Sequence, residues 1–404
     1  MAQAARTLRW WRPGRVRGPA VLACSLLAAC GGSSPSAPTA PAPVSAGFLH
    51  VLQGDAVVTY RIDAVTGQLR PSATQTVGNA HTLAGEPLGR YVYAAYGPRS
   101  GAAYDPSIVA YAADPSSGSL RTVSEASSQP IWCPTCAAWG RSQEWYWLSA
   151  SSTRVYAMWK TGTYHDVYDT YVTHAVGNDG QLGPAYQEDF DEQDPGSVAV
   201  DVDSDVFYKG TLTGGLTAHF VEPDGRLTQM GASHLCLASQ MSYANPLVAV
   251  RGFVFASGFV GPWPAWEKSV CSYEGPRLAS RANLGMQSLR AVAVAPRVPA
   301  SSSASLPATL VAMEMGAWPT GQYEIRLSAM GPDGDLKPLQ TIAGPGWVRH
   351  LLFHPSGRFF YVSHAATNSG SPASLTIHAI DAQGHPALVQ TLEDGGGTMA
   401  VTWR

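Results

Sequence analysis

The sequence predicts an all-β protein built from one repeated sheet, and three observations predict it. Charged residues make up only 14% of the 404 residues, whereas Gly (41), Pro (30), Tyr (17) and Trp (12) are frequent. That composition favours strands and turns over amphipathic helices. A turn glycine followed shortly by Leu recurs seven times, and strand-like runs precede it. Units of about 50 residues with four strands are typical of propeller blades. We therefore predict a seven-bladed β-propeller with four-stranded blades.

Residues 1–29 have the features of a bacterial lipoprotein signal peptide. Five arginines precede an apolar run over residues 20–29, which is too short to cross a bilayer. The run ends in Leu-Ala-Ala-Cys, which resembles the lipobox, so we expect cleavage before Cys30 and lipidation of its thiol. Processing at Cys24 and a secretory signal without lipid are the alternatives.

Residues 30–46 are expected to form the lipidated cysteine and a tether rich in Gly, Ser, Pro and Ala, followed by the propeller over residues 47–404. The lipid would attach the protein to the membrane without a spanning segment, facing the periplasm or at the outer membrane. Cleavage would remove five of the 26 basic residues and none of the 29 acidic ones, which leaves 21 basic residues and a net charge of −8. Nucleic acid is therefore not an expected partner.

The repeat is marked by a glycine that closes a polar turn. Each glycine follows a strand-like run, such as residues 57–62 or 375–380, and can supply the positive φ that a tight turn needs. Successive glycines are 45 to 62 residues apart. They are Gly67, Gly118, Gly180, Gly225, Gly275, Gly334 and Gly384.

Counting strands predicts how the ring closes. The first unit begins at residues 48–51 and lacks an inner strand, while the last strand, residues 398–403, has no unit of its own. We expect this C-terminal strand to complete the N-terminal blade in a three-plus-one closure, which would remove an open sheet edge.

Two segments resemble the lactonase-like, or 6-phosphogluconolactonase-like, propeller family. They are VRHLLFHPSGRF at residues 348–359 and TYRIDAVTGQL at residues 59–69. The resemblance extends over the chain from about residue 48 and concerns the fold more than the reaction, because blade motifs mostly encode packing and turns. It implies a lactone-processing site of Arg and Glu side chains, with a His, at the mouth of the central channel.

Three residues match this implied site. Arg290 opens an inner strand, Glu314 closes the second strand of the same blade, and Arg349 opens the next inner strand. Two guanidiniums could hold a carboxylate or phosphate, or stabilise the oxyanion of an attacked lactone. Bonding to blade carbonyls is the structural alternative for both arginines. Further candidates for ligand binding are His81 and Gln240, which align with the Arg290 and Arg349 position, and His350, for which packing within the strand is the alternative.

The sequence departs from the family pattern at the catalytic His. The third blade has Cys133-Pro134-Thr135-Cys136 where relatives often place a His at the start of the inner strand. Since export favours disulfides, we expect structural pairing, with a redox motif or half of a zinc site as alternatives. The disulfide candidates are Cys133, Cys136, Cys236 and Cys271, of which the last two could pair.

These observations predict an envelope-anchored binding propeller with an incomplete catalytic site. We expect a small anionic ligand and neither cofactor nor metal. The acidic stretch at residues 188–194 could bind Ca²⁺, but a solvated loop is the preferred interpretation. A periplasmic lactone hydrolase that uses Arg290, Glu314 and Arg349 is the alternative function.

Overall fold

The computed structural model divides the chain into two units, Met1–Ala42 and Pro43–Arg404. It describes residues of the second unit only. Within this part of the chain, no helix is long and apolar enough to cross a membrane. The described residues are 45–97, 107–127, 142–162, 167–190, 198–210, 215–234, 247–260, 267–283, 292–294, 309–317, 322–344, 346–366 and 372–403.

The described strands pair into seven four-stranded antiparallel sheets, which we number in chain order. The first sheet contains β28 (Met399–Thr402), β1 (Ser45–Gln53), β2 (Ala56–Asp63) and β3 (Leu69–Thr76), and the second β4 (Ala80–Gly85), β5 (Tyr91–Tyr96), β6 (Ser107–Ala113) and β7 (Leu120–Ser127). The third contains β8 (Ser142–Ala150), β9 (Arg154–Gly162), β10 (Val167–Val176) and β11 (Leu182–Phe190), and the fourth β12 (Val198–Asp201), β13 (Val206–Gly210), β14 (Gly215–Val221) and β15 (Leu227–His234). The fifth contains β16 (Leu247–Val250), β17 (Phe253–Val260), β18 (Glu267–Glu274) and β19 (Ala279–Asn283). The sixth contains β20 (Val292–Val294), β21 (Thr309–Ala317), β22 (Gln322–Met330) and β23 (Leu336–Gly344), and the seventh β24 (Val348–Phe353), β25 (Phe359–His364), β26 (Ser374–Ile380) and β27 (Pro386–Glu393).

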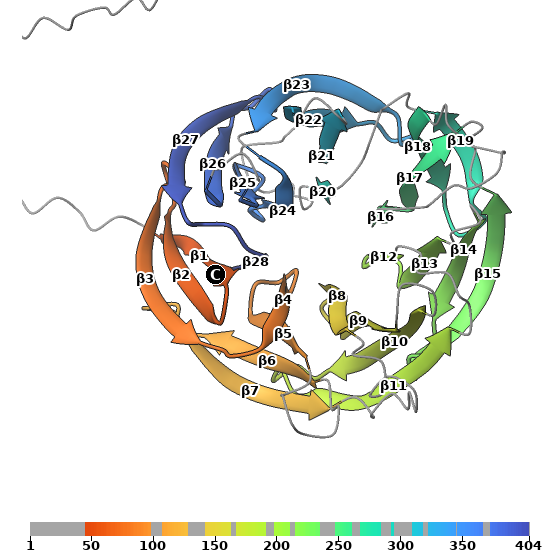
Figure 1. Cartoon of the computed structure of the whole chain (residues 1–404), viewed down its shortest axis with the longest axis horizontal. Coiled ribbons are helices and arrows are strands. Elements are labelled where there is room, and N and C mark those ends of the chain that lie inside the picture. The colour runs from red at the N-terminus through yellow and green to blue at the C-terminus, as the bar shows by residue number, and fades with distance from the viewer. Residues whose placement is uncertain are drawn as a thin grey trace, which may run out of the picture. The chain divides into compact units, whose positions relative to one another are not determined.

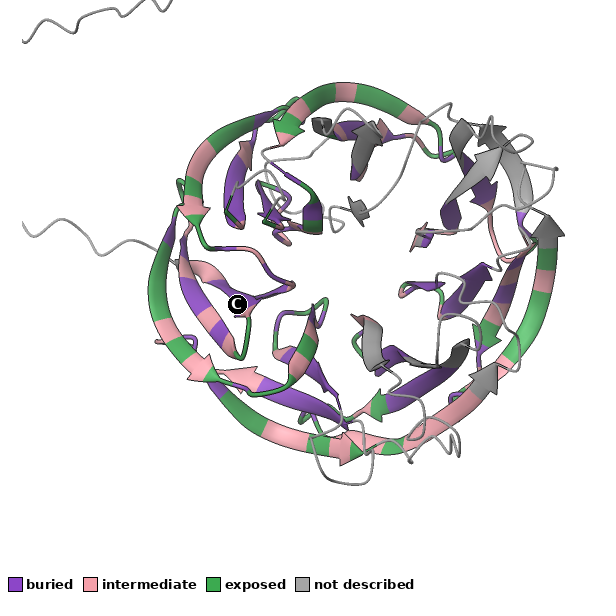
Figure 2. Cartoon of the chain, viewed as in Figure 1, coloured by how far each residue is buried: buried purple, intermediate pink, exposed green. Residues whose placement is uncertain are grey.

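The sheets surround a common centre, with one edge strand of each sheet innermost (Figure 1). The innermost strands are β28, β4, β8, β12, β16, β20 and β24. Figure 2 shows buried residues on the inner and middle strands, whereas exposed and partly buried residues alternate along outermost strands such as β3 and β7. This arrangement confirms the predicted all-β propeller with four-stranded antiparallel blades.

The first sheet combines strands from distant parts of the chain. β28 pairs antiparallel with β1, so that Thr402 lies opposite Phe48 and Met399 lies opposite Val51. The N–H of Leu52 also donates to the carbonyl of Thr398 at 2.9 Å.

The repeated turns adopt the predicted left-handed backbone conformation. Asp63 shows how such a turn is held, because its Oδ1 accepts hydrogen bonds from the N–H groups of Val65 and Thr66. Such side-chain caps are typical of Asp in turns. The φ angles of the seven turn glycines, all between +60° and +97°, confirm the prediction made for Gly67, Gly118, Gly180, Gly225, Gly275, Gly334 and Gly384.

Six of these glycines, all except Gly275, allow neighbouring sheets to pack closely. A Cβ on Gly118, in the second sheet, would lie 2.5 Å from the ring of Phe48 in the first sheet. Gly67 approaches Phe359 of the seventh sheet and Gly180 approaches Tyr91 of the second in the same way. Because only glycine leaves room for these rings, the turns contribute to the contact between sheets as well as to the hairpins.

Candidate functional site

His81 and Arg349 occupy equivalent positions where innermost strands begin. In β4 the pairing with β5 shifts between Ala80 and Thr82, so His81 lies at a bulge. In β24 the pairing with β25 shifts in the same way between Val348 and His350, which places Arg349 at the matching bulge. Bulges redirect side chains and are frequent next to functional sites. Both side chains are exposed.

The first sheet lies between these two residues in the ring, and its equivalent position carries no side chain. The N–H of Leu83 in β4 donates to Oγ1 of Thr398 at 3.1 Å, and the N–H of Met399 donates to Nδ1 of His350 at 3.0 Å. Thr398 and His350 are the acceptors of corresponding hydrogen bonds in neighbouring sheets, so they occupy equivalent positions. The residues that precede them, Gly397 and Arg349, are therefore equivalent as well. A Cβ on Gly397 would overlap the carbonyl oxygen of Leu52, so glycine is required there.

Arg349 is an uncompensated cation within the described part of the chain. Its guanidinium makes no ion pair or hydrogen bond with a residue that the structure describes. His81 is more confined, since its ring lies against Gly97, where a Cβ would overlap Nε2. An exposed guanidinium without a carboxylate partner can accept an anion in a bidentate geometry.

An additional exposed aromatic residue, Trp347, precedes Arg349 by two positions in the chain. The carbonyl of Trp347 accepts a hydrogen bond from the N–H of Ala365 at 2.8 Å, which fixes the backbone where β24 begins. The side chain of Trp347 is 42% exposed. Sequence reasoning missed this residue, although its position two residues before Arg349 was a usable signal.

His350 is a structural residue of the inner strands. Its Nδ1 is occupied by the N–H of Met399, and burial of the ring lowers its pKa to about 4. The imidazole is therefore neutral near pH 7, with its proton on Nε2. This environment matches the packing alternative and does not provide a free proton acceptor at Nδ1.

The other candidate residues are only partly described. The backbone of Glu314 lies in β21, opposite Ile325 of β22, and its side chain lies outside the described residues, as do Arg290 and Gln240. Cys271 is buried in β18 and disulfide-bonded. The other cysteines, including Cys30, Cys133, Cys136 and Cys236, also lie outside the described residues.

A set of buried tyrosines was not predicted from the sequence. The third residue of the second strand is a buried tyrosine in several sheets, and Tyr156 donates from this position to Oδ1 of Asp205 at 2.6 Å. In the first sheet, His50 of β1 takes the equivalent place by register, opposite Ala400 of β28, and lies between Oγ1 of Thr59 and Oγ1 of Thr402. Hydroxyls at the same position without a partner in the described structure belong to Tyr93, Tyr208 and Tyr361. These groups lie inside the blades and are not reachable by a ligand.

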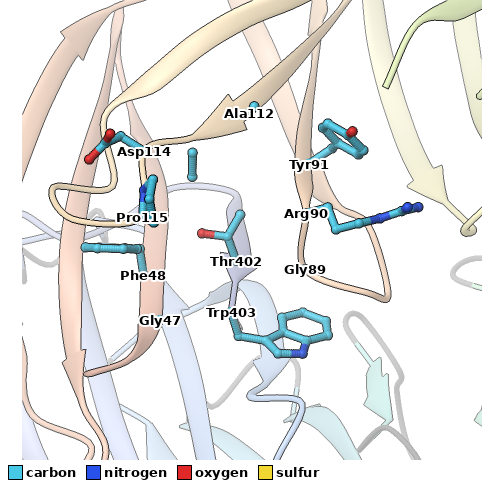
Figure 3. A pocket seen from close by; sticks show the side chains of 11 residues that line it. Gly47, Phe48, Gly89, Arg90, Tyr91, Ala112, Asp114, Pro115, Thr402 and Trp403 are labelled. Carbon is cyan, nitrogen blue, oxygen red and sulfur yellow. The ribbon is translucent and has the colours of Figure 1, made fainter. Parts of the chain in front are cut away.

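A pocket of about 370 Å³ lies between the first and second sheets, at the strand ends opposite to Arg349 and His81. Figure 3 shows Thr402 and Trp403 at its centre, with Phe48, Asp114 and Pro115 on one side and Arg90 and Tyr91 on the other. The structure thus offers two separate candidate sites, one at each end of the inner strands.

Comparisons with known proteins support the fold. No family model matches the chain, and no curated protein matches it. Among solved structures, a candidate 6-phosphogluconolactonase from Bacteroides uniformis is similar with a TM-score of 0.61 and 12% identity, over 88% of this chain and 100% of that chain. A Lactobacillus plantarum protein has a TM-score of 0.59 and 12% identity, over 89% and 99% of the two chains. A functionally unknown protein from Desulfotomaculum acetoxidans has a TM-score of 0.55 and 10% identity, over 88% and 99%. The chain therefore has the β-propeller fold of 6-phosphogluconolactonase-like structures, and at these identities the likeness concerns the fold alone.

Proposed function

We propose that this protein is an envelope-anchored, lactonase-like propeller lipoprotein that binds a small anionic ligand where the innermost strands begin. In this proposal Cys30 carries the lipid, and seven blades form a ring closed three-plus-one by β28. The seven sheets and the pairing of β28 with β1 support that closure.

The observation that carries the binding function is the placement of Arg349. The exposed guanidinium of Arg349 has no partner among the described residues. His81, two sheets further round the ring, occupies the same bulge position in its own innermost strand. Gly397 leaves the intervening position without a side chain. A carboxylate or phosphate could bind the guanidinium there.

Binding is favoured over catalysis because the neighbouring histidine is unsuited to general base chemistry. His350 already accepts a backbone hydrogen bond, and burial lowers its pKa to about 4. A base for lactone hydrolysis needs a pKa nearer the working pH and access to the attacking water. The second candidate function, a periplasmic lactone hydrolase using Arg290, Glu314 and Arg349, rests on the family resemblance.

The two functions predict different results with one pair of probes. The processed full-length protein in detergent would be titrated with gluconate by calorimetry and assayed with gluconolactone in a pH-stat. We expect gluconate binding that weakens with added salt, and no turnover above spontaneous hydrolysis. Turnover that is lost in Glu314→Gln would establish the hydrolase instead, and absence of both binding and turnover would refute the proposal.

A further inference from the structure

The bulge that carries Arg349 is fixed on its C-terminal side by a neighbouring sheet. β24 is the innermost strand of the seventh sheet, followed outward by β25 and β26 (Figure 1). The pairing of β24 with β25 is interrupted at Arg349, between Val348 and His350. After the interruption, Nδ1 of His350 accepts the N–H of Met399 of β28 at 3.0 Å. The position of the guanidinium therefore depends on what fixes the backbone before the interruption.

The imidazole of His364 and the N–H of Ala365, at the end of β25, fix that backbone. Nδ1 of His364 lies 3.3 Å from the carbonyl oxygen of Gly346, and the N–H of Ala365 donates to the carbonyl of Trp347 at 2.8 Å. His364 also lies opposite Val348 in the strand register. Because the side chain of His364 is 1% exposed and Gly346 is buried, loss of their hydrogen bond would leave a buried carbonyl without this donor.

A buried polar chain behind His364 determines which of its ring nitrogens carries the proton. A carbonyl oxygen can only accept, so Nδ1 of His364 donates to Gly346. Nε2 is then an acceptor, and it lies 3.3 Å from Oγ1 of Thr376, which can donate. The same Oγ1 lies 3.2 Å from Nε2 of His378, which donates in turn. Thr376 and His378 are buried as well.

Both imidazoles of this chain are neutral near pH 7. Burial lowers the pKa of His364 and lowers that of His378 to about 4. A neutral imidazole has one donor and one acceptor, which is what the contacts of His364 require.

We propose that His364 is a positioning residue for the anion site, because through Gly346 it fixes the backbone from which Arg349 projects. This inference rests on the function proposed above, since it concerns the guanidinium that would bind the anion. Ordering a long side chain on binding lowers the affinity, and a backbone that is already fixed reduces this cost. His364 itself does not contact the ligand, since its ring is buried.

The first test compares two substitutions of nearly the same branched shape. His364→Asn places an amide nitrogen near the position of Nδ1 and can still donate to Gly346, whereas His364→Leu cannot. In calorimetry at low salt, we expect gluconate to bind His364→Asn like the wild-type protein, and to bind His364→Leu roughly threefold to tenfold more weakly. Equal affinities of these two variants would overturn the proposal, because the hydrogen bond to Gly346 would then have no effect on the site.

The fourth sheet provides a matched control. Nε2 of His219 lies 3.0 Å from Oγ1 of Thr217, a histidine–threonine contact like that of His378. His219→Leu should therefore bind gluconate like the wild-type protein. A loss of affinity equal to that of His364→Leu would overturn the proposal, since any histidine of this kind would then have the same effect.

Amide hydrogen exchange tests the inference without a ligand. The N–H of Ala365 should exchange faster in His364→Leu than in the wild-type protein and in His364→Asn. Failure of the wild-type protein to bind gluconate would refute the proposed function alone, and exchange at Ala365 would then decide this inference. Unchanged exchange at Ala365 in His364→Leu would overturn it.

A measurement on the wild-type protein covers the case in which a variant does not fold. Long-range proton–nitrogen NMR distinguishes the neutral tautomers of an imidazole, and His364 should carry its proton on Nδ1. A proton on Nε2 instead would overturn the proposal, because Nδ1 could not then donate to Gly346.

Discussion

His350 and Met399 are joined by a 3.0 Å hydrogen bond in which the backbone N–H of Met399 donates to Nδ1 of the imidazole. One sheet further along the ring, the N–H of Leu83 makes the corresponding bond to Oγ1 of Thr398. A side chain of one innermost strand thus satisfies a backbone donor of the next. The last strand, β28, is tied in this way to β24 on one side and to β4 on the other.

The neutral histidines around β28 predict a loss of stability in acid. Burial lowers the pKa of His50 to about 3 and that of His350 to about 4. The unfolded chain, with histidine pKa values near 6.5, takes up these protons first as the pH falls. The free energy of unfolding should therefore decrease from about pH 6.5 to about pH 4, by roughly 3 kcal/mol for each such group at the lower end. Urea unfolding across this pH range measures the slope.

Substitution of one histidine shows how much of the pH dependence of the free energy of unfolding that residue causes. In His350→Gln the amide oxygen can still accept from Met399 but does not titrate, so the dependence on pH should become shallower. His385→Gln is the control, because the side chain of His385 is exposed and lies at the surface next to Asp381. An unchanged slope in His350→Gln would contradict the assignment.

A comparison of two glycines with positive φ distinguishes the free-energy cost of backbone strain from the cost of disturbed packing between sheets. Gly118 and Gly54 have φ of +74° and +57°, but only a Cβ on Gly118 would meet another residue, the ring of Phe48. Gly54→Ala should destabilise the protein by about 1 kcal/mol through strain. Gly118→Ala should cost about 2 kcal/mol more, because Phe48 must move. Equal losses in urea unfolding would show that the turn glycine does not limit the contact between sheets.

Removal of β28 tests the closure of the ring. Deletion of residues 398–404 would expose the edge of β1, so we expect aggregation or loss of the cooperative melting transition. Deletion of residues 31–40, within the predicted tether, should leave the melting temperature unchanged. A soluble protein without residues 398–404 that melts like the full chain would contradict three-plus-one closure.

Lipidation is predicted at a single cysteine. Cys30→Ala should abolish incorporation of labelled palmitate and leave the precursor unprocessed, whereas Cys24→Ala should still be labelled. Labelling of Cys30→Ala that is lost in Cys24→Ala would move the processing site to Cys24.

Local patterns predicted the features that depend on short stretches of chain. The positive φ of Gly67 and its six equivalents follows from the turn sequence, and the shared position of His81 and Arg349 follows from aligning the turns. The pairing of the C-terminal strand with the first sheet was expected from the strand count, but individual side-chain contacts between innermost strands were not predictable. The sequence pattern favoured His350 as a candidate ligand residue, whereas in the structure its Nδ1 accepts the N–H of Met399, and the pocket depends on the contact of Trp403 with Gly89. These contacts exist only once the ring is assembled.

The most direct test of the proposed function is the affinity for gluconate of wild type, Arg349→Ala and Arg121→Ala, measured by calorimetry at low salt. Arg121→Ala removes the same charge from the exposed outer strand β7 and should bind like wild type. Arg349→Ala should bind at least about tenfold more weakly, since a charge-assisted contact is lost. Equal affinity of the wild type and Arg349→Ala would contradict an anion site where the innermost strands begin.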